Sequence, residues 1–274
     1  MLLEGITRFC FAASYSVALL LEVAQLIRPA GVSRWLVRIF SGAGLFAHTF
    51  YLIWNLPSPA SPSGSMLLLS WVLAVFQLYG MLNHRRVAWS VFVLPVVLAL
   101  IVLSELLLRY GPSDPVLQGV ALLSGERFWG GLHGVMVMFA AVGITVAGVA
   151  SVMYLIQAER LRRKQNPIAG LRLLSLERLE SMNRHAVVWA FPLLTVGLLI
   201  GMIRMVTLDS HIADWAALKV LSTSALWLTF LLLLVLRFRV HLPGRRLAAW
   251  TLLAFGLMLL ALASSHPWLA EDWR

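Results

Sequence analysis

Long apolar segments separated by short polar stretches run through the whole chain. The apolar segments cover about residues 9–27, 36–56, 66–82, 88–108, 129–156, 185–206, 216–236 and 247–264. Each approaches or exceeds the ~20 predominantly apolar residues that a helix needs to cross the hydrocarbon core of a bilayer. Barrel strands alternate apolar and polar residues, which these segments do not, so helices must satisfy the backbone in lipid. The pattern predicts an all-α, polytopic bundle of eight transmembrane helices.

The composition leaves little room for anything outside the membrane. Of the 274 residues, 60% are hydrophobic and 12% are charged, whereas a soluble domain has roughly 45–50% apolar and 25% charged residues. These values exclude a soluble globular protein and a disordered chain. The net charge of +10 does not indicate nucleic-acid binding, because the basic residues are dispersed among short loops. We expect residues 1–274 to form a single integral membrane domain.

The basic residues predict an orientation in the membrane. Sixteen of the 22 Lys and Arg residues fall in the loops after the first, third, fifth and seventh apolar segments. Cytoplasmic loops carry the excess of Lys and Arg, so these loops are predicted to be cytoplasmic and both termini outside. The six basic residues on the predicted outer side are Arg8, Arg109, Arg127, Arg204, Lys219 and Arg274.

The most basic of the predicted cytoplasmic loops covers residues 160–184. Within it, Ser175 can cap a short helix that carries Leu176, Leu179 and Met182 on one side. Such a helix suits the membrane surface beside anionic lipids. The same loop also suits a docking surface for a partner protein, and the residues alone leave both interpretations open.

Four of the seven histidines, His48, His133, His211 and His266, gather on the predicted outer side. His133 has distinctive neighbours. Gly130, Gly131 and Gly134 surround it, and Trp129 precedes it by four residues, which places both side chains on one helix face. An imidazole, an aromatic ring and a gap lined by glycine suit an axially ligated haem. Gly130 and Gly134, four residues apart, are also typical of close helix packing. From the residues alone, helix packing is favoured over a haem site.

The basic residues near the outer face extend this hypothesis. Arg127, Arg204 and Lys219 could each pair with a haem propionate, or with Asp209, Asp214 or a lipid phosphate. The sequence contains no Walker loop, nucleophile elbow, HExxH pair or CxxC motif, and its single cysteine, Cys10, cannot form an internal disulfide.

Several segments in the second half of the chain form a series that is similar to a known family. They are His133, residues 154–164, 175–180 and 191–197, Gly201, and residues 244–250. Their order and spacing across three helices resemble the cytochrome c assembly protein family, the CcsA/CcmC/HemX-like membrane proteins. The resemblance extends from about Trp129 to the C-terminus and is strongest over residues 129–266.

The resemblance implies that the protein handles haem at the outer face of the membrane. Family members carry haem to apocytochrome c or, in the HemX-like branch, influence tetrapyrrole synthesis or have no settled role. His133 matches the family histidine that opens the fifth helix, and His48 matches the second-helix histidine of the HemX-like branch. His266 is the candidate for the histidine near the outer end of the last helix, although it falls several residues early.

The sequence departs from the cytochrome c synthetases of the family at two places. Their tryptophan-rich segment ends in Trp-Asp-Pro-Lys, whereas residues 209–227 here retain scattered matches and lack the Asp-Pro step. The histidine expected just before the last cytoplasmic loop is also absent, and Val235 and Arg237 stand near its position. A reduced, HemX-like member fits better than a synthetase, and we expect no independent enzyme activity.

These observations predict a haem-binding or haem-handling protein of cytochrome c biogenesis in the bacterial inner membrane. His133 would ligate the haem iron beside Trp129, with His266 opposite and His48 deeper in the bundle. Arg127, Arg204 or Lys219 would hold the propionates. The expected partners are haem, other cytochrome c assembly membrane proteins, apocytochrome c and the lipid bilayer, with no nucleic acid.

Two alternatives remain open. A HemX-like regulatory or scaffold protein of tetrapyrrole or cytochrome assembly would bind no haem and would act through the basic loop at residues 160–184. A small-molecule transporter is less favoured, because the sequence shows neither paired repeats nor a cluster of charges at mid-bilayer depth.

Overall fold

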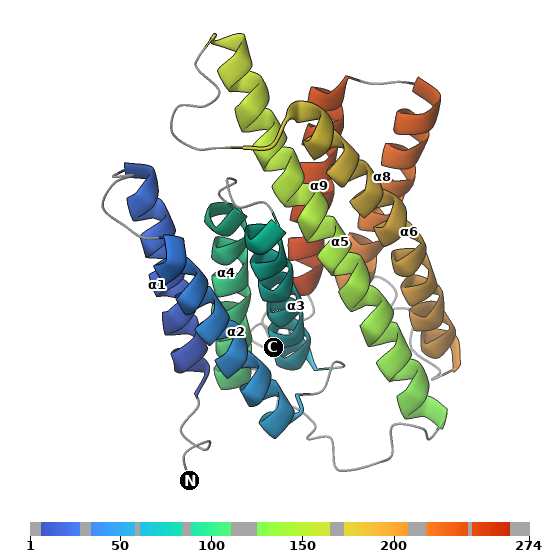
Figure 1. The fold of residues 1–274 in the computed structure, drawn as a ribbon. Helices are drawn as coiled ribbons and strands as arrows, with labels where there is room; N and C mark the ends of the chain where they lie inside the picture. The colour runs from blue at the N-terminus through green and yellow to red at the C-terminus, as the bar shows by residue number, and fades with distance from the viewer. Residues whose placement is uncertain are drawn as a thin grey trace. The chain divides into compact units, whose positions relative to one another are not determined.

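The computed structural model describes residues 7–27, 34–57, 61–83, 89–110, 125–164, 173–207, 218–240 and 243–263. Over these ranges the chain forms eight α-helices and one short π-helix, without a β-strand (Figure 1). The helices belong to two compact units. Unit 1 comprises residues 1–117 with 164–173, and unit 2 comprises residues 118–163 with 174–274.

Unit 1 contains the first four helices. They are α1 (Arg8–Ile27), α2 (Arg34–Asn55), α3 (Pro62–Asn83) and α4 (Trp89–Tyr110). Helix α1 packs against α2 and α4, and α3 packs against α2 and α4. The sequence defines the start of α3 locally, because Ser61 accepts a hydrogen bond from the Gly64 amide at 3.0 Å and Pro62 occupies the first helical position.

Unit 2 contains the longer helices. They are α5 (Gly125–Arg162), α6 (Leu176–Thr207), α8 (Leu218–Val235), which continues into the π-helix η2 (Leu236–Val240), and α9 (Gly244–Ala263). Helix α5 packs against α6 and α9, and α8 packs against α6 and α9. The sequence analysis placed a separate short helix after Ser175. Instead, those residues form the first turns of α6, whose helical hydrogen bonding starts from the Ser175 carbonyl.

Seven helices in the described ranges, α2 to α6 with α8 and α9, are long and apolar enough to cross a membrane. Helix α1 has 20 residues and is not among the seven. The all-α polytopic bundle is therefore confirmed, and the protein is a multi-pass membrane protein. The outside location of both termini and the single-domain organisation stay predictions.

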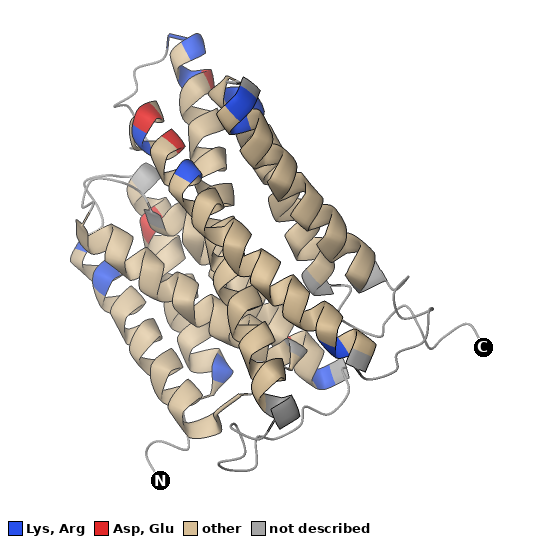
Figure 2. Ribbon diagram, turned by 90° about the vertical axis from the view of Figure 1, so that its right-hand side faces the viewer, with Lys and Arg blue, Asp and Glu red and all other residues tan. Residues whose placement is uncertain are grey.

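Charge is distributed unevenly between the two ends of unit 2. Basic residues gather where α5 ends, α6 begins, α8 passes into η2 and α9 begins (Figure 2). These residues are Arg160, Arg162, Arg163, Lys164, Arg178, Arg184, Arg237, Arg239, Arg245 and Arg246. At the opposite end, Arg204 is the basic residue whose side chain the structure describes. The positive-inside rule assigns the basic end to the cytoplasm.

The buried amide of Asn183 joins the helices at the basic end. Its nitrogen donates to Ser151 Oγ at 2.8 Å and to Thr251 Oγ1 at 3.2 Å, while its oxygen accepts from Arg237 at 2.9 Å. Arg237 also donates to the Glu180 carbonyl at 3.2 Å and lies 3.8 Å from its carboxylate. One side chain therefore links α5, α6, α9 and η2, where an unpaired polar group would be costly to bury.

Small residues let α5 and α6 approach each other closely in the middle of unit 2. A Cβ atom added at Gly143 would lie 2.9 Å from the Ala190 Cβ and 3.2 Å from the Ala186 carbonyl oxygen. A Cβ at Gly197 would lie 2.9 Å from a methyl group of Val137. Hydrogen atoms fill these positions, so the two backbones are in contact through their glycines.

We predict that Gly143→Ala destabilises unit 2, because its methyl group meets the α6 backbone and cannot be accommodated by a rotamer change. The expected loss is about 1–3 kcal/mol of unfolding free energy. Gly131→Ala, in the same helix, meets no atom within 4 Å and is the matched control. Denaturant unfolding in detergent compares the two variants, and equal stabilities would contradict the close packing of α5 on α6.

Candidate functional site

A cavity of about 790 Å³ lies among α5, α6, α8 and α9 of unit 2. Most of its wall is apolar, and polar groups enter from α5, α6 and α8. The lining includes His133, Leu198, Gly201, Met202, Trp227 and Met258. Trp227 is oriented by a hydrogen bond from its indole nitrogen to Thr195 Oγ1 at 2.9 Å, which joins α8 to α6. Its size and apolar walls are those of a small-molecule or cofactor site.

His133 is the histidine of this cavity, and two glycines of α6 hold its ring. The Nδ1 atom lies 2.7 Å from the Gly197 carbonyl oxygen, 64 residues away in sequence. A carbonyl can only accept, so Nδ1 carries the proton, and the neutral imidazole has its lone pair on Nε2. A Cβ atom at Gly201 would lie 3.0 Å from the ring, so the imidazole fits against α6 only because Gly201 has no side chain.

This hydrogen bond prepares the imidazole for metal binding. Metal-ligating histidines almost always donate their second N–H to a carbonyl or carboxylate, which fixes the tautomer and the ring orientation. His133 makes such a bond to Gly197. The ring therefore has the tautomer that a haem ligand needs.

Arg204 occupies the next turn of the same contact between α5 and α6. Its guanidinium group lies over Gly130, in the space where a side chain at that position would stand. Gly130 precedes His133 by one turn on α5, and Arg204 follows Gly201 by one turn on α6. The structure thus brings together two of the predicted residues, an imidazole in the cavity and a cation beside it.

Of the other residues predicted for this site, one is described and lies outside the cavity lining, and the side chains of three lie outside the described residues. Trp129 is half-exposed, makes an edge contact with Phe128 at 5.7 Å and does not line the cavity. Arg127 and Lys219 belong to the first turns of α5 and α8, but their side chains lie outside the described residues. His266 also lies outside the described part of the chain.

His48 lies in unit 1, on α2, and is fully buried. Its ring stacks on Phe11 with centroids 4.2 Å apart and planes 1° from parallel, and Tyr15 meets its edge. Within the described ranges neither ring nitrogen has a hydrogen-bond partner, although the Leu67 backbone approaches the ring without hydrogen-bond geometry. His48 and His133 belong to different units, so the predicted sharing of one site stays a prediction.

The sequence analysis assigned no role to Gly197 and Gly201, although both stand in the segments that resemble the family. Their four-residue spacing on an apolar helix is the same small-residue signal that Gly130 and Gly134 give on α5. Treating the two pairs as facing surfaces would have predicted the contact between α5 and α6. It would not have shown that an imidazole occupies it.

Comparison with known proteins identifies the class of this membrane protein. The model of the family described as "Cytochrome C assembly protein" matches residues 61–270. The chain belongs to this family, which confirms the resemblance seen in the sequence and gives the protein a role in cytochrome c biogenesis.

The chain is also similar to Protein HemX of Brevibacillus brevis. The two are 27% identical over 207 residues, which cover 74% of this chain and 72% of the HemX protein. This similarity agrees with the predicted HemX-like branch of the family. No solved structure matches the chain.

The geometry around His48 predicts an unusual response to mutation. His48→Leu should change the unfolding free energy by less than about 1 kcal/mol, because removal of an unpaired buried polar group offsets the lost ring stacking. Asn183→Leu is the comparison, and should cost about 1–3 kcal/mol because it removes the acceptor of Arg237 Nη1 and the donor to Ser151 and Thr251. Thermal unfolding of both variants in detergent tests this. An equal loss in both would show that the imidazole has a polar partner.

Proposed function

We propose that the protein binds haem in the cavity of unit 2, near the predicted outer face of the membrane, and presents it to a partner in cytochrome c biogenesis. The observation that carries this proposal is the hydrogen bond from His133 Nδ1 to the Gly197 carbonyl, made in the wall of the cavity. With Nδ1 bonded to this carbonyl, Nε2 is the ring nitrogen that we propose as the iron ligand. In this role haem is a cargo, and supplies the iron porphyrin that a c-type cytochrome requires.

The residues present fit such a cargo. The cavity volume of about 790 Å³ lies within the range of roughly 300–1,000 Å³ found for ligand sites. Its apolar wall suits the porphyrin faces, His133 supplies an axial nitrogen, and Arg204 stands one turn away as a partner for a propionate. A charge-assisted hydrogen bond between guanidinium and carboxylate is among the stronger polar contacts in proteins.

The remaining parts of the haem hypothesis rest on the sequence. We propose His266 as the second axial ligand, Arg127 and Lys219 as further propionate partners, and His48 as a further haem-binding histidine deeper in the bundle. We propose apocytochrome c and other cytochrome c assembly membrane proteins as partners, and the bacterial inner membrane as the location.

A second candidate function is a HemX-like regulatory or scaffold protein that binds no haem. The basic end of unit 2 favours it, since Arg162, Arg163 and Arg245 are well exposed there although all three pair with Glu159. This function would depend on the basic end and would survive the loss of His133.

Absorption spectra of detergent-purified protein, oxidised and reduced, distinguish these functions. We expect a stoichiometric Soret band that is lost or shifted in His133→Ala and retained in His185→Ala. His185 is an exposed histidine near the start of α6 and is the matched control. Loss of the band in His266→Ala as well would support ligation by two histidines. Absence of haem from the wild type, even after loading with excess haem, would overturn the proposal in favour of the scaffold.

Arg204→Gln should weaken haem binding without abolishing it, because it removes the propionate partner and leaves the axial ligand. We expect a threefold to tenfold rise in the dissociation constant for haem, or roughly 1 kcal/mol. Arg163→Gln, an exposed arginine at the opposite end of unit 2, is the control. Haem titration followed at the Soret maximum measures both variants, and an unchanged dissociation constant for Arg204→Gln would remove Arg204 from the site.

A further inference from the structure

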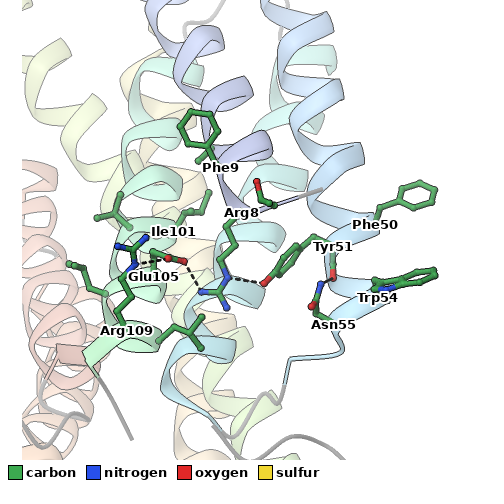
Figure 3. Close-up of a pocket in the computed structure, with 14 residues that line it drawn as sticks. Arg8, Phe9, Phe50, Tyr51, Trp54, Asn55, Ile101, Glu105 and Arg109 are labelled. Atoms are coloured by element: carbon green, nitrogen blue, oxygen red, sulfur yellow. Dashed lines mark hydrogen bonds and ion pairs between the residues drawn. The ribbon is translucent and has the colours of Figure 1, made fainter. Parts of the chain in front are cut away.

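Unit 1 has a cavity of its own, of about 930 Å³, between the start of α1, the end of α2 and the end of α4. Figure 3 shows Arg8 inside it, between Tyr51 on α2 and Glu105 on α4. Aromatic and aliphatic side chains form the rest of the wall, among them Phe9, Trp54 and Val102. This cavity has no part in the haem proposal.

Arg8 is held firmly in this cavity. Its side chain is 13% exposed. Its Nε donates to the Tyr51 hydroxyl at 2.9 Å, and Nη1 donates to the carbonyl and hydroxyl oxygens of Ser104 at 3.3 and 3.2 Å. Helices α2 and α4 therefore fix the guanidinium from two sides. The positive charge stays at the end of three apolar helices, where an unpaired charge is costly.

The cavity carries more positive than negative charge. Glu105 lies 3.5 Å from Arg8 and accepts a hydrogen bond from Arg109 Nε at 2.9 Å. One carboxylate thus faces two guanidinium groups, and the Arg109 side chain is 67% exposed. The described lining residues therefore leave one positive charge that an anion can complement.

Both arginines stand on the side of the membrane where basic residues are scarce. Six of the 22 Lys and Arg residues are predicted to lie outside, and Arg8 and Arg109 are two of them. The positive-inside rule accounts for the basic residues of the cytoplasmic loops. It does not account for Arg8 and Arg109, which are predicted to lie on the outer side. Their joint presence in one cavity gives a local reason for them.

The apolar part of the cavity opens towards lipid. Phe9, Trp54 and Val102 line the cavity and are largely exposed, and α2 and α4 are both apolar enough to cross a membrane. A tryptophan at the end of such a helix is typical of the membrane interface. An occupant of this cavity is therefore expected to have an anionic head and an apolar body, and to enter from the bilayer.

We propose that this cavity binds an anionic phospholipid of the outer leaflet. Its phosphate would lie against the exposed side of the Arg109 guanidinium, which Glu105 leaves uncovered, and its acyl chains would lie along Phe9, Trp54 and Val102. The site draws on α1 and α2, which precede the part of the chain that matches the family. It is independent of the haem proposal, and either can fail while the other holds.

Native mass spectrometry of the full-length protein, exchanged into mixed micelles with phosphatidylglycerol or phosphatidylcholine, tests the proposal. We expect phosphatidylglycerol to be retained about threefold more than phosphatidylcholine. Arg109→Gln should remove this preference. Glu105→Gln should increase it, because it removes the competing carboxylate and keeps an acceptor for both arginines. Arg163→Gln, at the far end of unit 2, should leave it unchanged.

Arg8→Gln should also reduce the preference for phosphatidylglycerol. Two further measurements keep the proposal testable where that variant fails to fold. Ala12→Trp fills the cavity without changing its charge, and should reduce retention of phosphatidylglycerol as much as Arg109→Gln does. The proposed site would be overturned if Ala12→Trp left the retention of phosphatidylglycerol unchanged. It would also be overturned if Arg109→Gln and Glu105→Gln changed that retention equally. The assignment to a phospholipid would be overturned if inorganic phosphate or oleate displaced the bound phosphatidylglycerol as effectively as added phosphatidylglycerol does. Haem loading of these variants should match that of the wild type.

Discussion

The close approach of α5 and α6 is the constraint on which unit 2 depends. Glycines on both helices remove the side chains that would separate them, at Gly143 in the middle and at Gly197 nearer the outer end. In a bilayer, where lipid tails are as apolar as leucine, close packing and hydrogen bonds replace the hydrophobic effect as the force between helices. The same lack of side chains creates the niche for His133 and the space for Arg204. Helix association and the candidate haem site therefore have one physical origin.

Two networks of polar side chains, one in each unit, connect the apolar helices near their ends. Asn183 and Arg237 form one network in unit 2, and Arg8 and Glu105 form another in unit 1. Both networks join helices that are far apart in sequence, because a hydrogen bond to another helix is the available substitute for water. His48 and the Tyr15 hydroxyl at its edge differ from these networks, since both are buried without a hydrogen-bond partner in the described ranges.

Membership of the cytochrome c assembly family and the geometry of unit 2 support each other. The family match covers all of unit 2 that the structure describes, together with α3 and α4 of unit 1. His133 lies within that match, and its hydrogen bond to Gly197 is the arrangement expected of an imidazole that ligates a metal. Both observations support the proposal that the protein holds haem and presents it to a partner.

The sequence by itself determined the apolar segments that become the long helices, because the length of an apolar segment reports directly on bilayer thickness. It also determined the charge asymmetry, the family, and His133 as the central candidate. It did not determine where α6 begins, since the turns before His185 were predicted as a separate short helix. Only the tertiary structure decided which groups meet. It showed that Gly197 fixes the His133 tautomer, that Arg204 lies over Gly130, one turn from that histidine, and that Arg8 lies against a residue 96 positions away. Such contacts depend on the rotation of each helix about its axis and on its neighbours. In a chain apolar on nearly every face, the pattern of residues specifies neither.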